Sequence, residues 1–204
     1  MLGLPRATEI KKIITKKKVY EHFGMEMSAD RRKSFDGDIA RITVMNEISP
    51  VSVNLAAGDE VKAFFVVLVQ LRQKEFDRQN IAFISKMFGQ KLLIVLEYEE
   101  QQRLAIWQTK LMMGEWTSPD SLHIELTGLD LDTVWAHAVA GIAGIELQQG
   151  GTLNEQIAQQ EKREKLKKEI AKLEKLAWAE KQPKKKFEFV QKLNRMREEL
   201  KADE

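Results

Sequence analysis

The stretch from Lys91 to Lys110 places the strongest constraint on how this chain folds. Its five consecutive apolar residues, 92–96, are typical of a strand that is buried on both faces. A mostly polar corner, 97–103, follows, and residues 104–107 are apolar again. Two short apolar runs joined by a few polar residues usually pair as antiparallel strands, so the sequence predicts a β-hairpin at the centre of the core.

Other segments before residue 150 show strand or helix patterns of their own. By alternation and β-branched content, we predict strands at 39–48, 51–55, 61–71, 111–113 and 122–126. By capping residues and apolar spacing, we predict helices at 8–22, 29–35, 77–88 and 131–145. Ser28 is the expected cap of the second helix, and Asp130 or Asp132 that of the last. The sequence therefore predicts an α+β domain over residues 1–150, with a mostly antiparallel sheet of five or six strands and helices packed on it.

Residues 151–204 are much more charged and predict a helical hairpin that follows a linker at 148–151. Thr152 and Glu155 have the spacing of a capping box, and a long helix from there ends at Lys181. Gln182 and Pro183 interrupt it before a return helix, 184–201. Apolar residues recur at intervals of three and four, which is typical of a narrow, coiled-coil-like seam.

So narrow a seam buries little apolar area by itself, and we therefore expect this hairpin to dock on another protein. The residues expected to bind that partner are Leu166, Ile170, Leu173, Trp178, Leu193, Met196 and Leu200.

The formal net charge of +2 conceals three blocks of different sign. Residues 1–41 and 152–204 each carry +4, whereas residues 42–151 carry −6. An acidic centre argues against a continuous DNA-binding face on the core, so any contact with a polyanion is expected from the two ends. The candidate phosphate-binding residues are Arg31, Arg32, Lys33, Lys184, Lys185 and Lys186. The alternative for these clusters is a solvated helix face, because acidic residues interleave throughout the C-terminal unit.

The composition also excludes several classes of protein. There is no cysteine, which excludes disulfides, thiol catalysis and zinc–thiolate sites. No run approaches the roughly 20 apolar residues of a membrane span, and the first residues do not resemble a signal peptide. The histidines His22, His123 and His137 are widely separated and lack the spacing of metal ligands. We therefore expect a cytoplasmic protein with no metal, no cofactor and no membrane partner.

One arrangement in the central hairpin favours a catalytic alternative. Restriction-type nucleases place a carboxylate on one strand and a Glu/Gln-x-Lys triplet on the next, because Mg²⁺ prefers oxygen ligands and the lysine steadies the attacking water. Glu97 or Glu99 could supply the carboxylate, Gln108 and Lys110 the triplet, and Glu60 a further ligand. The plainer interpretation is that acids in a hairpin corner and a lysine at a strand end are solvated, and the Pro-Asp that precedes the strand in such nucleases is missing.

Short motifs along nearly the whole chain resemble a bacterial family known as a domain of unknown function. They are the MLGLP opening, Ser49-Pro50 with Asn54-Leu55, LLIVLEYE at 92–99, Trp116, LHIELTGLDL at 122–131 and EKQPKKKFE at 180–188. Members of that family tend to be encoded beside restriction-type DNA methyltransferases and helicase or translocase genes of phage defence.

The resemblance implies a context and not a set of catalytic residues. Together with the hairpin, it leads us to expect a non-enzymatic accessory or adaptor subunit of a restriction-like defence complex. The implied partner is a large methyltransferase or a helicase/translocase subunit, with DNA as a further candidate. The alternative is the divergent Mg²⁺-dependent nuclease that uses the 97–110 hairpin.

Overall fold

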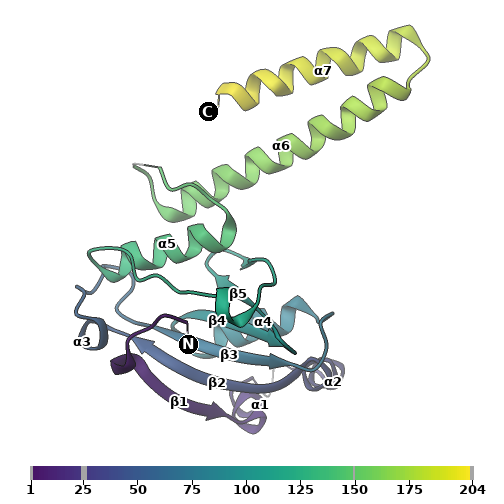
Figure 1. Cartoon of the computed structure of the whole chain (residues 1–204). Coiled ribbons are helices and arrows are strands. Elements are labelled where there is room, and N and C mark those ends of the chain that lie inside the picture. Colours follow the sequence, from purple (N-terminus) through teal and green to yellow (C-terminus); the bar gives the residue numbers. More distant parts are fainter. Residues whose placement is uncertain (1, 24–26, 149, 203–204) are drawn as a thin grey trace. The chain divides into compact units, whose positions relative to one another are not determined.

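The computed structural model describes residues 2–23, 27–148 and 150–202, and the chain folds as two compact units, Met1–Leu147 and Gln148–Glu204. The first unit is built on a sheet and the second is a pair of helices (Figure 1). Met1 of the N-terminal motif and Gln149 of the expected linker lie outside the described residues. None of the helices that the structure describes is long and apolar enough to cross a membrane. The six-stranded sheet and the helices give the chain the predicted α+β class.

The sheet has six strands in its described part, and their spatial order is their order in the sequence (Figure 1). The strands are β1 (Glu9–Ile14), β2 (Ile39–Ile48), β3 (Phe64–Leu71), β4 (Lys91–Tyr98), β5 (Gln101–Trp107) and β6 (Leu111–Met113). Neighbours pair antiparallel except β3 and β4, which are parallel. A parallel pair needs a crossover, and helix α4 (Arg78–Met87) supplies it. The mostly antiparallel sheet is confirmed.

The β4–β5 hairpin has the predicted antiparallel form. Leu93 pairs with Ile106, Val95 with Leu104 and Glu97 with Gln102 across the two strands. Residues 92–96 are at most 2% exposed, which explains why that run is apolar without alternation. The turn between the strands contains Glu99 with a positive φ of 52°.

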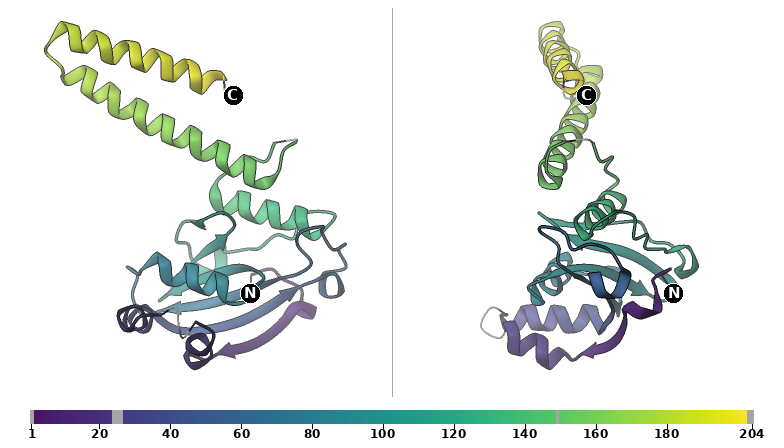
Figure 2. Two further views of the ribbon diagram at one scale, coloured as in Figure 1. Left: turned by 180° about the vertical axis from the view of Figure 1, so that it is seen from behind. Right: turned by 90° about the vertical axis from the view of Figure 1, so that its left-hand side faces the viewer.

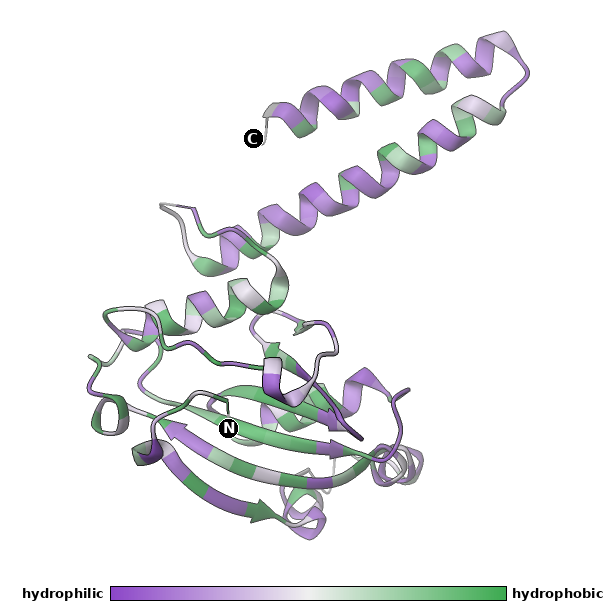
Figure 3. Ribbon diagram, viewed as in Figure 1, coloured by the Kyte–Doolittle hydropathy of each residue, from purple (hydrophilic) through white to green (hydrophobic). Residues whose placement is uncertain are grey.

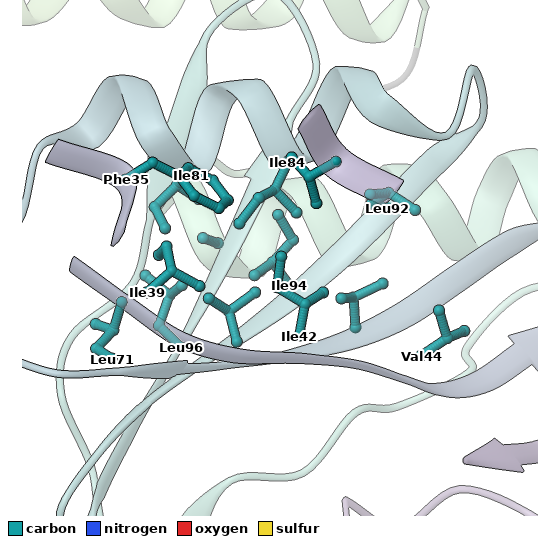
Figure 4. Packing of buried hydrophobic residues seen from close by; sticks show 14 of the residues in the cluster. Phe35, Ile39, Ile42, Val44, Leu71, Ile81, Ile84, Leu92, Ile94 and Leu96 are labelled. Carbon is teal, nitrogen blue, oxygen red and sulfur yellow. The ribbon is translucent and has the colours of Figure 1, made fainter. Parts of the chain in front are cut away.

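Helices cover both faces of the sheet (Figure 2). On one face α1 (Lys16–Phe23), α2 (Ala29–Asp38) and α4 enclose the main apolar cluster, where Ile84 lies above Ile94 (Figure 4). On the other face lies α5 (Leu131–Ala143), whose Trp135 ring meets the Phe64 ring edge-on with centroids 5.4 Å apart. Each fully buried side chain of this size contributes about 1.5–3 kcal/mol to folding.

The helix caps follow the sequence closely. The Ser28 hydroxyl accepts a hydrogen bond from the Arg31 backbone N–H, as predicted for α2. Of the two candidates for α5, Asp130 is the cap, because its Oδ1 accepts from the Thr133 N–H at 2.8 Å. Asp132 has a different role, since its carboxylate accepts backbone N–H groups from residues 59–61.

The helix predicted at 8–22 is wrong over its first half. A 3₁₀ turn, η1 (Arg6–Thr8), leads into strand β1, and only α1 is helical. The strand lies at the sheet edge with Ile10 and Ile13 exposed, and its register shifts between Glu9 and Lys12. A bulged edge strand with exposed apolar residues loses the alternation by which strands are recognised.

Two further predicted strands are also wrong. Residues 51–55 alternate, yet the chain there forms the single turn α3 (Pro50–Val53), because Ser49 caps it and Pro50 suits a first helical position. Residues 122–126 follow a second 3₁₀ turn, η2 (Pro119–Ser121), and form no strand. Leu122 and Ile124 are buried, as expected for a strand. However, the segment is joined to another part of the unit by a backbone hydrogen bond that the Ile124 N–H donates to the Leu2 carbonyl oxygen, and this bond does not make a strand ladder.

The second unit consists of helices α6 (Leu153–Ala179) and α7 (Pro183–Ala202), which form the predicted antiparallel hairpin. The Thr152 and Glu155 capping box is present, with each side chain bonded to the other's backbone N–H. α6 ends two residues before the predicted Lys181. Ion pairs between Lys162 and Glu199 (3.2 Å) and between Glu174 and Arg197 (2.6 Å) border the seam.

Candidate protein-interaction site

Six of the seven expected partner-binding residues form the hairpin's own core. Ile170, Leu193 and Met196 are 5–9% exposed and pack with Ala177, and the remaining three are partly buried against them, namely Leu166, Leu173 and Leu200. Phe189 completes this cluster. The seam therefore holds α6 to α7, and a partner would have to separate the helices to reach it.

Trp178 is different, since it is 88% exposed. Three more exposed apolar side chains lie at the same end of the hairpin: Leu176, Phe187 and Val190. Because the helices are antiparallel, the last turn of α6 lies beside the first two turns of α7, which brings the four residues to one end. We call them the hairpin-end surface. Hydrophilic residues cover most of both helices (Figure 3), so this apolar group is unusual for its surroundings.

Lysines surround the hairpin-end surface. Lys181, Lys184, Lys185 and Lys186 are exposed, and none of the four forms an ion pair with another described residue. The nearby acids in the sequence are Glu180 and Glu188. Glu180 accepts a hydrogen bond from the Gln182 backbone N–H, which shapes the joint between the helices. The end of the hairpin is thus both apolar and basic.

The other basic cluster, Arg31 to Lys33, belongs to the first unit and is partly occupied by local contacts. Arg31 forms an ion pair with Asp77 at 3.0 Å and a hydrogen bond with Gln79. Arg32 lies over the Tyr20 ring, 5.6 Å from its centre. Lys33 is exposed on α2. The contacts of Arg31 and Arg32 attach α2 to its neighbours.

The structure does not bring the four residues of the nuclease hypothesis together. Glu97 lies beside the β4–β5 turn, where its carboxylate accepts from the Gln70 and Gln102 amides at 2.8 and 2.6 Å. Glu99 lies in that turn. Gln108 follows the far end of β5, about 20 Å along the strand from the Glu97–Gln102 pair. Its Oε1 accepts from Lys91 Nζ and Trp135 Nε1.

The possible extra ligand Glu60 lies at the Gln108 end. Burial lowers the pKa of Lys91, and the nearby carboxylates of Glu60 and Asp132 oppose that shift. A mixed cluster of Glu60, Lys91 and Gln108 therefore exists at one end of the hairpin, while Glu97 and Glu99 lie at the other.

The fold brings two of the three histidines to one groove, a proximity that their sequence separation did not indicate. His123 and His137 line a cavity of about 580 Å³ between α5, the β4–β5 strands and the segment 114–127. His137 Nδ1 lies 2.7 Å from the Thr127 carbonyl oxygen, and His22 is in α1. Within the described ranges, no group of three or more His, Asp or Glu residues is arranged to hold a metal ion.

These observations define a two-unit α+β protein with a sheet-based unit and a helical hairpin that ends in an exposed, basic and apolar surface. Its sequence matches a known family over residues 2–200. The chain belongs to the family described as Domain of unknown function (DUF4391). No curated protein and no solved structure matches it.

Proposed function

We propose that this protein is a non-enzymatic adaptor subunit that docks on a larger protein through the hairpin-end surface. The observation that carries the proposal is the 88% exposure of Trp178 on a helix whose apolar seam is already filled. Tryptophan is among the residues that contribute most to protein interfaces, because it buries a large apolar area and still has a polar N–H. Phe187, at 63% exposure, gives the same end a second aromatic anchor.

The seam and the hairpin-end surface have separate roles in this proposal. Leu166, Ile170, Leu173, Leu193, Met196 and Leu200 keep the hairpin rigid, so that Trp178 and Phe187 are presented in a fixed geometry. A pre-organised surface loses less conformational entropy on binding than a flexible one. The lysines beside it favour a partner surface with negative charge around an apolar groove.

The proposed partner is the large DNA methyltransferase or the helicase/translocase of a restriction-like defence system. This part of the proposal comes from the sequence motifs that resemble a family encoded beside such genes. The lysines at 184–186 would then meet either acidic residues of that partner or DNA held by it.

The test is co-expression of the full-length protein with a DNA methyltransferase or helicase of a restriction-like system from its own host, followed by copurification. The double variant Trp178→Ala/Phe187→Ala should reduce recovery of the partner by at least about 10-fold, because each lost anchor is worth roughly 1–2 kcal/mol or more. Deletion of residues 151–204 should abolish it. Raising the salt concentration should have little effect if apolar docking dominates.

A matched control is Val51→Ser, which removes an apolar side chain that is 96% exposed in the first unit. It should leave copurification unchanged. If the double variant keeps its helical circular dichroism and still binds the partner like the native protein, the hairpin-end surface is not the docking site. A partner retained after deletion of 151–204 would contradict the adaptor role of the hairpin altogether.

A further inference from the structure

Four cations and two tryptophan rings lie together on one side of the first unit, beside α4 and strands β5 and β6. We call this group the cation–aromatic strip. Its members are Lys74, Arg78, Lys86, Arg103, Trp107 and Trp116. They come from α4, from the loop before it, from β5 and from the segment after β6. These residues are far apart in a part of the sequence, 42–151, whose net charge is −6. The sequence alone therefore did not indicate a local group of cations.

One half of the strip is a pocket of about 440 Å³ between α4, β5 and β6. Ala82, Phe83, Trp107 and Leu111 give it apolar walls, while Arg78 and Lys86 add positive charge. Lys86 Nζ lies 4.7 Å from the centre of the Trp107 ring. The pocket therefore combines a flat aromatic ring with cations, which is suitable for a planar anionic ligand.

The other half is centred on Trp116, which two cations approach. The Arg103 guanidinium lies 5.2 Å and Lys74 Nζ 5.8 Å from the centre of its ring. The Arg103 Nε is buried and has no hydrogen-bond partner. Burial lowers the pKa of Arg103, the negative charge of Glu115 opposes this shift, and the positive charge of Arg78 adds to it by a smaller amount. Arg78 is thus within electrostatic reach of Arg103, and the two halves adjoin.

The cations of the strip are poorly neutralised. Arg78, Lys86 and Arg103 form no ion pair within 4.0 Å with any residue in the described part of the chain. Lys74 donates to Gln101 Oε1, a neutral oxygen, at 2.7 Å. A local excess of positive charge on an otherwise acidic unit attracts a polyanion to this one side.

We propose that the cation–aromatic strip binds single-stranded nucleic acid, with bases stacked on Trp107 and Trp116 and phosphates on Arg78, Lys86 and Arg103. The inference goes beyond the docking of a protein partner, because it concerns the first unit and a different ligand.

At Trp107 the energetic comparison favours a base over the exposed Lys86 ammonium that lies there now. An exposed cation–π contact is worth about 0.5–1 kcal/mol. Stacking of a base on an aromatic side chain is worth about 1–3 kcal/mol. A base can therefore replace Lys86 at Trp107, and the displaced ammonium is then free to meet a phosphate.

The dimensions favour a single strand of a few nucleotides. Arg78 and Lys86 are separated by about 12 Å along α4, and Arg103 and Trp107 by about 14 Å along β5. A duplex keeps its bases stacked inside and cannot place one in the Trp107 pocket. An acidic peptide would match the charge but has no planar rings to stack on two tryptophans.

The test measures binding of the full-length protein to a labelled oligothymidylate of about 12 nucleotides by fluorescence anisotropy, over a series of salt concentrations. The double variant Arg78→Ala/Lys86→Ala changes two exposed side chains and should weaken binding by at least about 10-fold. It should also reduce the slope of log K against log salt by about 1.4, which is about 0.7 for each lost phosphate contact. Trp107→Phe keeps an aromatic ring and should weaken binding less than Trp107→Leu, which keeps only apolar bulk.

The matched control is the triple variant Lys184→Ala/Lys185→Ala/Lys186→Ala, which removes more charge from the second unit. It should change the affinity by less than about 2-fold. The proposal is overturned if the oligonucleotide does not bind at low salt, or if the triple variant loses as much affinity as the double variant. Equal affinity for the matching duplex or for a poly-glutamate peptide would also overturn it, because then neither stacking nor a single strand is required.

Discussion

The carboxylate of Asp132 accepts a hydrogen bond of 2.7 Å from the backbone N–H of Val61. The same carboxylate also accepts the N–H of Asp59 at 2.6 Å and that of Glu60 at 3.2 Å. Three consecutive N–H groups thus converge on a side chain more than seventy residues away, at the start of α5. Each such charge-assisted bond contributes roughly 1.5–3 kcal/mol, so this contact fixes the loop before β3 against α5.

Gly58→Ala should destabilise the first unit by about 1–3 kcal/mol, because an added β-carbon would overpack this contact. That carbon would lie 2.1 Å from Asp132 Oδ1 and 2.7 Å from the Asp132 backbone nitrogen. Urea denaturation measures the change. The control is Gly37→Ala in α2, where nothing lies within 4 Å and the change should stabilise by about 0.5–1 kcal/mol. Equal midpoints for the two variants would contradict the packing at Gly58.

Asn80→Asp should destabilise the same unit by about 3–5 kcal/mol, because it places an unpaired second carboxylate in a buried position. Asn80 is fully buried, and its Nδ2 donates to Asp38 Oδ2 at 2.7 Å. Asp38 is itself buried and accepts from the Gln73 side chain and the Asp77 N–H. The control is Gln79→Glu at the neighbouring position, where the side chain is exposed beside Arg31. A negative charge there should leave the free energy of unfolding unchanged. Chemical denaturation of both variants tests the difference.

The core strands could be predicted from the sequence because their signal is local. The continuous apolar run 92–96 and the β-prone segment before Leu71 are buried by both layers of helices, and the bounds of β2 agree with the prediction. The wrongly predicted strands lie where flanking residues determine the local conformation. Val51 alternates with Val53 as in a strand, yet Ser49 and Pro50 start a helical turn and Val51 is left 96% exposed.

The candidate sites were less predictable, because a site depends on which distant residues meet. The spacing of the hairpin seam identified Leu193 and Met196 as apolar contacts but could not show that α6 itself covers them. Trp178 was identified because it interrupts a charged helix. Arg78, Arg103 and Trp116 carry no pattern in the sequence, and only the register of β5 beside α4 and the 114–117 segment brings them together.

Asp36→Asn should lower stability at neutral pH and have progressively less effect in acid. Lys16 Nζ donates to the Asp36 carboxylate at 2.8 Å and Tyr20 Oη at 2.6 Å, and these bonds hold its pKa below the ordinary value. A depressed folded-state pKa gives stability that is present above the unfolded pKa, about 4, and is lost as the pH falls through the folded value. Thermal melts of both proteins across this range measure the effect. A difference that persists undiminished well below pH 4 would contradict it.

The Tyr20 side of the same contact has the opposite pH dependence, because its stabilisation is lost as the pH rises. Burial, reinforced by the hydrogen bond to Asp36, raises the pKa of Tyr20. Its stabilisation is therefore complete below the unfolded tyrosine pKa, about 10, and is lost as the pH rises further. Tyr20→Phe should remove this alkaline loss, which melts at high pH would show.

Leu193→Ala should destabilise the hairpin by about 2–4 kcal/mol and leave the first unit unchanged. Leu193 is 5% exposed between α6 and α7, and the cluster around it is confined to the second unit. Heating should then melt part of the helical circular dichroism early, before the main transition. Val190→Ala, at a position that is 40% exposed, is the matched control. It should change the free energy of unfolding of the hairpin by less than about 0.5 kcal/mol. One cooperative transition that moves as a whole would show that the two units unfold together.

The agreement between spatial and sequential strand order has a consequence for how the chain is made. Each new strand joins the free edge of the strands already present, so a nascent chain can extend the sheet in the order in which it leaves the ribosome. The slowest addition should be β4, because it must wait for α4 to fold across before it can lie parallel to β3. Until then the apolar edge of β3 is unpaired, and this interval is when the growing chain is most exposed to aggregation.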